Sequence, residues 1–118
     1  MNLNQFLSSS LTNAWIKEPY LQLYIRKSTR LYNKQIYQCL DLANILVQTN
    51  YRGKGIFTKF LTRFEPLAFS LNKTIFVESI LNYNLKNFFL KSGYILDPQS
   101  SDFSPCVFKF KEQTNVKN

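Results

Sequence analysis

The sequence contains no histidine and only two cysteines, Cys39 and Cys106, among its 118 residues. Without histidine it can form no Ser-His-Asp triad, no Cys-His nucleophile and no histidine-ligated metal site. Two thiols cannot build a four-thiolate zinc site or a disulfide framework. We therefore expect no metal cofactor, and we expect both cysteines to be reduced and packed as small apolar side chains.

Acidic residues and long apolar runs are also scarce. Seven Asp and Glu stand against fifteen Lys and Arg, for a formal net charge of +8. This charge favours an acidic ligand or partner: nucleic acid, a phosphorylated cofactor or an acidic protein surface. The apolar stretches are far shorter than the roughly 20 residues that span a membrane. The first ten residues lack the basic and apolar regions of a signal peptide. We predict a cytoplasmic protein with no membrane association.

Apolar and aromatic residues are plentiful, at 45% and 16% of the chain, which is typical of a packed globular domain. A chain of this length buries roughly two-thirds of its unfolded surface, enough for one core. Residues 1–118 are therefore predicted to form a single domain, with residues 112–118 as a polar tail.

The first half of the chain predicts one helix and two strands. Residues 1–17 are expected to be helical, because apolar side chains recur at helical spacing, at Leu3, Phe6, Leu7, Leu11 and Trp15. Apolar and polar residues then alternate from Leu21 to Arg26, as in a half-buried strand, and Arg30 to Lys34 is a plausible turn. Ile36 to Gln48 becomes almost continuously apolar towards its end, as a central strand does.

The second half predicts a helix after a glycine-rich loop, and then shorter elements. Helical spacing begins at Phe57, and Pro66 is expected to kink that helix or end it near Glu65. The remaining predictions are a strand at 74–79, a helix at 84–92 followed by Gly93 as its C′ residue, and strands at 94–96 and 106–110. This alternation predicts an α/β fold: a mixed sheet of about five to six strands, parallel at its centre and flanked by helices.

The segment from Leu46 to Ile56 has the clearest chemistry, because an apolar strand runs through a basic, glycine-rich turn directly into a helix. The unpaired amides at a helix N-terminus attract anions, and glycine lets the backbone approach a ligand closely. Arg52 and Lys54 add positive charge. The segment therefore suits a phosphate or pyrophosphate, although it has neither Walker A nor Rossmann spacing.

The same segment resembles the cofactor motif of the GNAT superfamily of N-acetyltransferases, [QR]-x-x-G-x-[GA]. Arg52 and Gly55 match its first and fourth places, and Phe57 stands where Gly or Ala is usual. The family's second signature, N-x-x-A-x-x-x-Y-x-x-x-G-[FY], is matched in order and spacing by Asn82, Leu85, Phe89, Gly93 and Tyr94. Leu85 and Phe89 replace the usual Ala and Tyr. The resemblance covers residues 36–95, as the recognisable core of a single GNAT-like domain.

The resemblance implies an acetyl-CoA-dependent N-acetyltransferase, in which an amine attacks the thioester directly. Family members bind the pyrophosphate on the amides that correspond to Arg52 to Thr58, and the pantetheine arm pairs with the strand that ends at Val47. That strand splays from the one carrying Glu78. The cofactor-binding residues implied in this way are Leu46, Val47, Arg52, Gly53, Lys54, Gly55, Ile56, Phe57, Thr58, Asn82 and Phe89.

Two carboxylates match places where branches of the family carry a catalytic base. Asp41 lies six residues before Val47 on the central strand, where the histone-acetylating branch has a glutamate, and Glu78 matches the ribosomal-protein acetyltransferases. Either could also be an ordinary strand residue. The family's acid is a Tyr at the place of Phe89, but a thiol with a pKa of about 8.5 can leave as thiolate without a strong acid.

Three functions remain open on the sequence. The N-terminal part is abbreviated for this family, which suits a large acceptor such as a protein amine. The same abbreviation, with Phe57 and Phe89, also fits a non-catalytic GNAT-fold protein that acts through interactions. A small nucleic-acid-binding domain ranks last, and rests on the basic charge and interleaved aromatics such as Tyr20 and Tyr24. The oligomeric state stays open.

Overall fold

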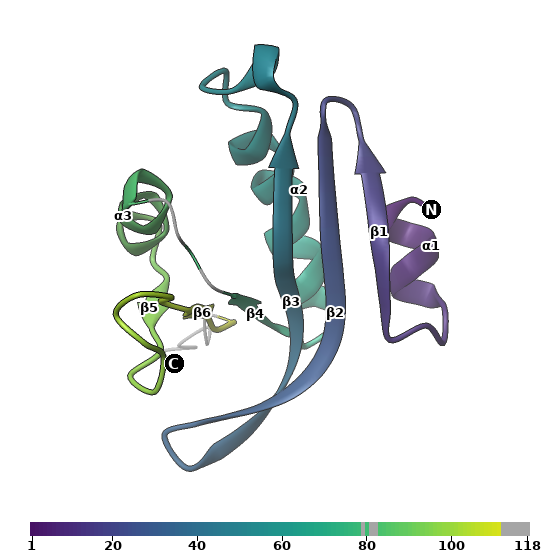
Figure 1. Ribbon diagram of the computed structural model, residues 1–118. Coiled ribbons are helices and arrows are strands. Elements are labelled where there is room, and N and C mark those ends of the chain that lie inside the picture. Colours follow the sequence, from purple (N-terminus) through teal and green to yellow (C-terminus); the bar gives the residue numbers. More distant parts are fainter. Residues whose placement is uncertain (79, 81–82, 112–118) are drawn as a thin grey trace, which may run out of the picture.

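The computed structural model describes residues 1–78, 80 and 83–111, which form one mixed sheet with helices against it (Figure 1). The sheet order is β1-β2-β3-β4-β6-β5. The strands are β1 (Asn13–Glu18), β2 (Leu21–Tyr32), β3 (Gln35–Val47), β4 (Thr74–Val77), β5 (Ile95–Leu96) and β6 (Val107–Lys109). The helices are α1 (Leu3–Ser8), α2 (Ile56–Ser70), α3 (Tyr83–Lys91) and the 3-10 turn η1 (Thr49–Tyr51). The predicted α/β class and the parallel pairing at the sheet centre, between β3 and β4, are confirmed.

The prediction of a helix over residues 1–17 is wrong beyond Ser8. The hydroxyls of Ser8 and Ser9 donate to helix carbonyls at 2.7 Å, and such local bonds compete with continued helix. Residues 13–18 form β1 instead, paired antiparallel with β2. This pairing buries Ile16 and leaves Trp15 on the other side of the strand, 44% exposed. Burial in a sheet has therefore overridden the helical spacing.

The alternation from Leu21 to Arg26 is confirmed as strand, but the predicted turn is displaced. β2 runs to Tyr32, and the turn is made by Asn33 and Lys34, at φ 49° and 67°. Two consecutive residues in the left-handed backbone conformation form a turn whose twist matches that of the flanking strands, so a two-residue loop is enough to join them. The hairpin extends beyond the start of β4, because β4 pairs with β3 only from Cys39 onwards (Figure 1).

The sequence predicts that Pro66 kinks α2 or ends it near Glu65; α2 continues through Pro66 to Ser70, so the second of these alternatives is wrong. Proline removes one backbone hydrogen bond from a helix interior. The helix persists because its apolar face is fully packed, with buried side chains on both sides of the proline, at Phe60, Leu61, Phe64 and Ala68.

The helix predicted at 84–92 is confirmed as α3, with Gly93 in the left-handed conformation at φ 89°. The amide of Tyr94 donates to the Phe89 carbonyl at 3.0 Å, which is the long bond of a Schellman motif. The strand predicted at 74–79 ends at Val77, and Ser79 lies outside the described residues. β5 and β6 are shorter than the predicted strands.

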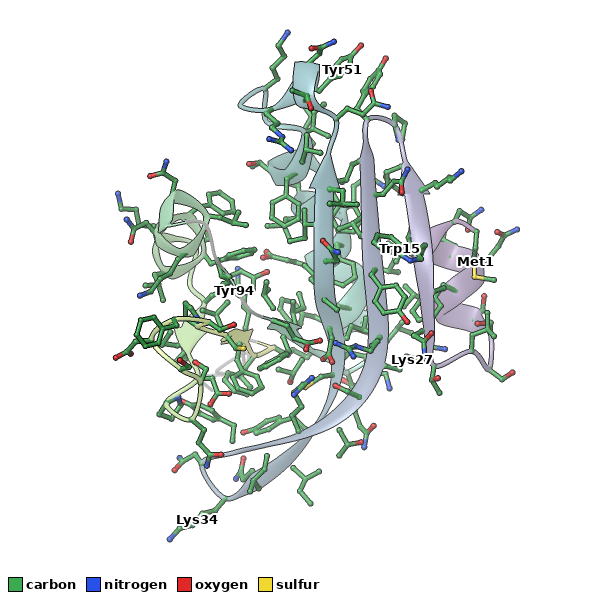
Figure 2. The ribbon with its side chains drawn as sticks, viewed as in Figure 1. Met1, Trp15, Lys27, Lys34, Tyr51 and Tyr94 are labelled. Atoms are coloured by element: carbon green, nitrogen blue, oxygen red, sulfur yellow. The ribbon has the colours of Figure 1, made fainter. Side chains whose placement is uncertain are left out.

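The helices and the main core share one face of the sheet. Its buried side chains come from all three α-helices and from the strands, for example Phe6, Phe60 and Phe89 beside Leu23 and Leu40. The other face of β1–β3, which we call the open face, carries three cross-strand rows: Lys17–Gln22–Leu46, Trp15–Tyr24–Asn44 and Asn13–Arg26–Asp41. None of the described helices covers these rows, and Trp15 projects from them (Figure 2).

In the part of the chain that the structure describes, no helix combines the length and apolarity needed to cross a membrane.

Candidate functional site

β3 and β4 separate after four paired residues, Cys39–Leu42 with Thr74–Val77. The amide of Glu78 still donates to the Leu42 carbonyl at 3.1 Å, but the amide of Ile80 donates to Pro105 instead. A bulge in β3 marks the same point, because Ala43 is skipped between the pairs of Leu42 and Asn44 with β2. From Ala43 to Val47, the β3 edge towards β4 has no strand partner among the described residues.

A cavity of about 630 Å³ lies beside this opening, on the helix side of the sheet. Its walls come from three places: the end of β3, the loop and first turn of α2, and α3. The lining residues are Ile45, Val47, Tyr51, Arg52, Gly53, Gly55, Ile56, Phe57, Thr58, Asn84, Leu85 and Phe88. Cavities that hold small molecules and cofactors span about 300–1,000 Å³, so this one is large enough for part of a CoA-sized ligand.

The loop from Gln48 to Gly55, which we call the glycine loop, brings backbone amides to one end of the cavity. Gly53 and Gly55 have φ values of 74° and 76°, and no heavy atom beyond the adjacent residues lies within 4 Å of the place where a Cβ would stand. Gly55 is the N-cap of α2, and no side chain caps the helix. The first amides of α2 are therefore available to an anion, and the helix dipole makes that end positive.

Most of the predicted cofactor residues meet at this cavity, but three of those that the structure describes do not. Lys54 is absent from its lining, and its ammonium lies 5.9 Å from the centre of the Tyr51 ring. Leu46 lines a separate depression of about 320 Å³ with open-face residues such as Lys17 and Gln22. Phe89 is fully buried in the core. Asn82 lies outside the described residues.

Five lining residues are not among the predicted cofactor residues: Ile45, Tyr51, Asn84, Leu85 and Phe88. In the sequence analysis, Leu85 is only a motif position. Ile45 could have been found, because it lies two residues from Val47 and side chains of a strand alternate between faces. Phe88 and Phe89 are adjacent on α3, and only their packing decides which one reaches the cavity.

Phe57, at the place where the GNAT motif has Gly or Ala, forms part of the cavity wall. Its ring lies 5.7 Å from that of Phe89 and 6.5 Å from that of Phe88, both edge-on. The ring therefore joins α2 to α3, and it makes this wall apolar beside the polar loop.

Asp41 is buried on the open-face side of β3, with its side chain 1% exposed. Its carboxylate accepts a hydrogen bond from the Ser28 hydroxyl at 2.7 Å and two from Arg30, at 2.7 and 3.3 Å. Burial alone lowers the pKa of Arg30, but the hydrogen bond and charge of Asp41 more than offset this, so that the pKa is raised. Asp41 therefore links β3 to the side chains of Ser28 and Arg30 on β2.

Glu78 follows β4 at the point where the two strands separate. Its carboxylate is ion-paired with Arg26, lies 3.8 Å from Arg30 Nη2, and has a side chain that is 21% exposed. The two predicted bases therefore belong to one network on the open face, joined by Arg30. Within the described residues, the buried Nε of Arg26 has no hydrogen-bond partner. No group of three potential metal ligands occurs in the described ranges.

No protein-family model and no curated protein matches this chain. Solved structures do match. A mutant of KacT aligns with a TM-score of 0.60 and 18% identity, over 92% of this chain and 81% of KacT. The AtaT mutant toxin bound to the C-terminus of the antitoxin AtaR aligns with a TM-score of 0.62 and 16% identity, over 78% of this chain and 59% of the AtaT chain.

Two further complexes give similar values. AtaT with the AtaR C-terminus and acetyl-CoA aligns with a TM-score of 0.55 and 14% identity, over 78% and 59% of the two chains. The KacTA–DNA complex aligns with a TM-score of 0.59 and 18% identity, over 78% of this chain and 58% of the matched chain. The chain thus spans less than three-fifths of the matched chains in the AtaT and KacTA complexes. These toxins are GNAT-fold proteins, so the likeness confirms a GNAT-like fold for this chain.

Proposed function

We propose that this chain is an acetyl-CoA-dependent N-acetyltransferase, which moves an acetyl group to an amine. The proposal rests on one observation: the strands β3 and β4 separate beside a cavity that ends at the uncapped N-terminus of α2. The matched AtaT complex contains acetyl-CoA, which supports this choice of ligand.

The residues around the cavity fit such a ligand by charge and by shape. The amides from Ile56 to Thr58 would hold a pyrophosphate, with Arg52 and Lys54 adding charge nearby. The open space at Gly53 and Gly55 leaves room for phosphate oxygens. Ile45, Val47 and Phe88 would contact the apolar arm. Acetyl-CoA bound there supplies the activated acyl group.

Of the two carboxylates, Glu78 is the better candidate for the base. It lies where the strands separate and is partly exposed, whereas Asp41 is enclosed and accepts three hydrogen bonds. Glu78 would take the proton of the acceptor ammonium directly or through water. Asp41 would then act indirectly, by holding Arg30 beside Glu78.

The proposal needs no phenolic acid at position 89. A thiol has a pKa of about 8.5, so a thiolate can leave near pH 8 without protonation by the protein. The acceptor would approach from the open face, where Glu78 is partly exposed and no described helix intervenes. This face has room for a large acceptor, such as a protein amine.

The closing test uses a charge change at Gly55 with a matched control. Asn and Asp both tolerate the left-handed conformation of Gly55 better than other residues, and they differ only in charge. We expect Gly55→Asn to bind CoA nearly as well as wild type. Gly55→Asp should bind at least about fivefold more weakly, because a charge about 4 Å from a phosphate costs roughly 1–4 kcal/mol.

Calorimetric titration with CoA measures this difference, and an acetyl-transfer assay on an acceptor panel follows. If both variants bind like wild type, the ligand does not lie on this loop. If wild type binds no CoA, the proposed function is wrong.

A non-catalytic GNAT-fold protein is the second candidate, because Phe57 occupies a place that the family keeps small. CoA binding without transfer to any acceptor in the panel would favour it. The nucleic-acid-binding alternative rests on the net charge of +8. Binding to oligonucleotides that weakens steeply with salt would support it.

A further inference from the structure

The glycine loop is attached to the turn between β1 and β2 by a pair of tyrosines. The rings of Tyr20 and Tyr51 stack with their centres 3.7 Å apart and their planes 12° from parallel. Tyr20 belongs to the turn, whereas Tyr51 ends η1 and lines the cavity. The stack thus joins two segments that are 31 residues apart along the chain, at the end of the sheet where Figure 2 labels Tyr51.

The backbone of Tyr20 holds the start of the same loop. Its carbonyl accepts a hydrogen bond from the Gln48 amide at 2.9 Å, directly after β3 ends. The Gln48 carbonyl in turn accepts from the Tyr51 amide at 2.8 Å. Tyr20 therefore contacts the loop at two points, through its ring and through its carbonyl.

The conformation of Tyr20 is unusual for such a bulky residue. Its φ is 65°, in the left-handed region, where large side chains are disfavoured. Residues kept in such a conformation are held by the structure around them. The ring is also 42% exposed, so burial in the core does not explain its position.

Tyr51 connects this stack to the charged part of the loop. The Lys54 ammonium lies 5.9 Å from the centre of the Tyr51 ring, and Arg52 follows Tyr51 directly. Hydrogen bonding to the Tyr20 side chain raises the pKa of Tyr51, as the close approach of the two rings implies. Fixing Tyr51 therefore restricts the loop that carries both cations and both glycines.

We propose that Tyr20 is a positioning residue, which clamps Tyr51 and so holds the glycine loop in the shape that receives the CoA pyrophosphate. This inference rests on the proposed function. Tyr20 lies outside the cavity lining, and its role is to order the loop before the ligand binds. A loop ordered before binding loses less conformational freedom on binding, which increases affinity. The clamp therefore acts on CoA affinity, and not on the chemical step.

The test compares two substitutions at Tyr20. Tyr20→Asn keeps the left-handed backbone, because Asn tolerates it, but removes the ring. Tyr20→Phe keeps the ring and removes the hydroxyl. Tyr24→Ala serves as a control, because Tyr24 is on the same hairpin but faces Trp15.

Two measurements separate the clamp from a merely structural role. Backbone ¹⁵N order parameters of residues 50–55, without ligand, should fall in Tyr20→Asn from about 0.85 towards 0.6. The dissociation constant for CoA should rise roughly three- to tenfold, as loss of one aromatic pair implies. Tyr20→Phe and Tyr24→Ala should match wild type in both measurements, and kcat at saturating acetyl-CoA should change little in Tyr20→Asn.

The outcomes separate the clamp from the proposed function. Unchanged order parameters or unchanged CoA affinity in Tyr20→Asn would overturn the clamp and leave the proposed function standing. If wild type binds no CoA, the proposed function fails. The contact of Tyr20 with the loop is then judged by the order parameters of residues 50–55 alone: if they do not fall in Tyr20→Asn, the clamp is overturned as well.

Discussion

Arg30 forms a two-point ion pair with the buried carboxylate of Asp41, with N–O distances of 2.7 and 3.3 Å. The guanidinium also lies 3.8 Å from the centre of the Phe76 ring, so it is held by a charge and by an aromatic face. Arg30 also lies 3.8 Å from Glu78, so the contact with Asp41 fixes where the guanidinium stands relative to Glu78.

We predict that Asp41→Asn destabilises the fold by about 2–4 kcal/mol, because it removes the nearer charge partner of a half-buried guanidinium and leaves only Glu78, 3.8 Å away. CoA affinity should stay at the wild-type value. Urea unfolding measures the first quantity and titration the second. Glu18→Gln is the matched control: it breaks the surface pair with the exposed Arg63, and should cost less than about 1 kcal/mol. Equal losses in the two variants would contradict a special role for the Asp41 pair.

Glu78→Gln should lower kcat by roughly 10²–10⁴, the usual contribution of a general base, while CoA still binds. The amide keeps the shape of the side chain and can still contact Arg26, so the fold should be retained. Steady-state acetyl transfer at saturating acetyl-CoA measures the effect. Full activity in this variant would show that the base is another group or is not needed.

Phe89→Tyr should not create the missing acid. The ring of Phe89 is fully buried and lies 4.9 Å from that of Tyr94, outside the cavity lining. A hydroxyl forced into this core should cost about 1–3 kcal/mol, and turnover should not increase. Phe88→Tyr is the control on the cavity wall and should cost little. A rise in turnover with Phe89→Tyr would mean that the side chain at position 89 reaches the reacting atoms.

We predict that the protein loses stability at alkaline pH because of the buried thiol of Cys39. Burial, with the nearby charge of Asp41, raises the pKa of its thiol to about 12. The unfolded thiol ionises near pH 8.5, so the stability from keeping Cys39 protonated is complete below that pH. It is lost progressively as the pH rises from about 8.5 towards 12.

Unfolding free energies of wild type and Cys39→Ala between pH 7 and 11 test this. The difference between the two proteins should shrink as the pH rises. Native Cys39 should also react slowly with iodoacetamide at pH 8. A constant difference over this pH range would contradict the shift.

Local sequence signals predicted the parts of the site that lie along one segment. The run from Val47 to Thr58 combines a strand end, two glycines and a helix start, and all of these depend on neighbours within a few residues. The glycines at 53 and 55 do adopt left-handed conformations, and the helix does begin at Ile56. Gly93 likewise follows its helix as its C′ residue.

Features that need a distant partner were not predictable in this way. Residues 13–18 carry helical spacing, yet they form a strand because β2 offers a partner whose apolar face they complete. Pro66 is tolerated because α2 is packed against the core on both sides of it. The stack of Tyr20 on Tyr51 depends on two turns that meet only when β1, β2 and β3 are in register.

The sequence by itself determined the charge, the α/β class and the glycine loop at the start of α2, because composition and short-range periodicity fix these. The tertiary structure decided which side chains share the site: that Phe88 rather than Phe89 lines the cavity, and that Asp41 is enclosed by Arg30 while Glu78 is partly exposed. The physical reason is that orientation about a helix and pairing across a sheet depend on packing between segments, which no local pattern encodes.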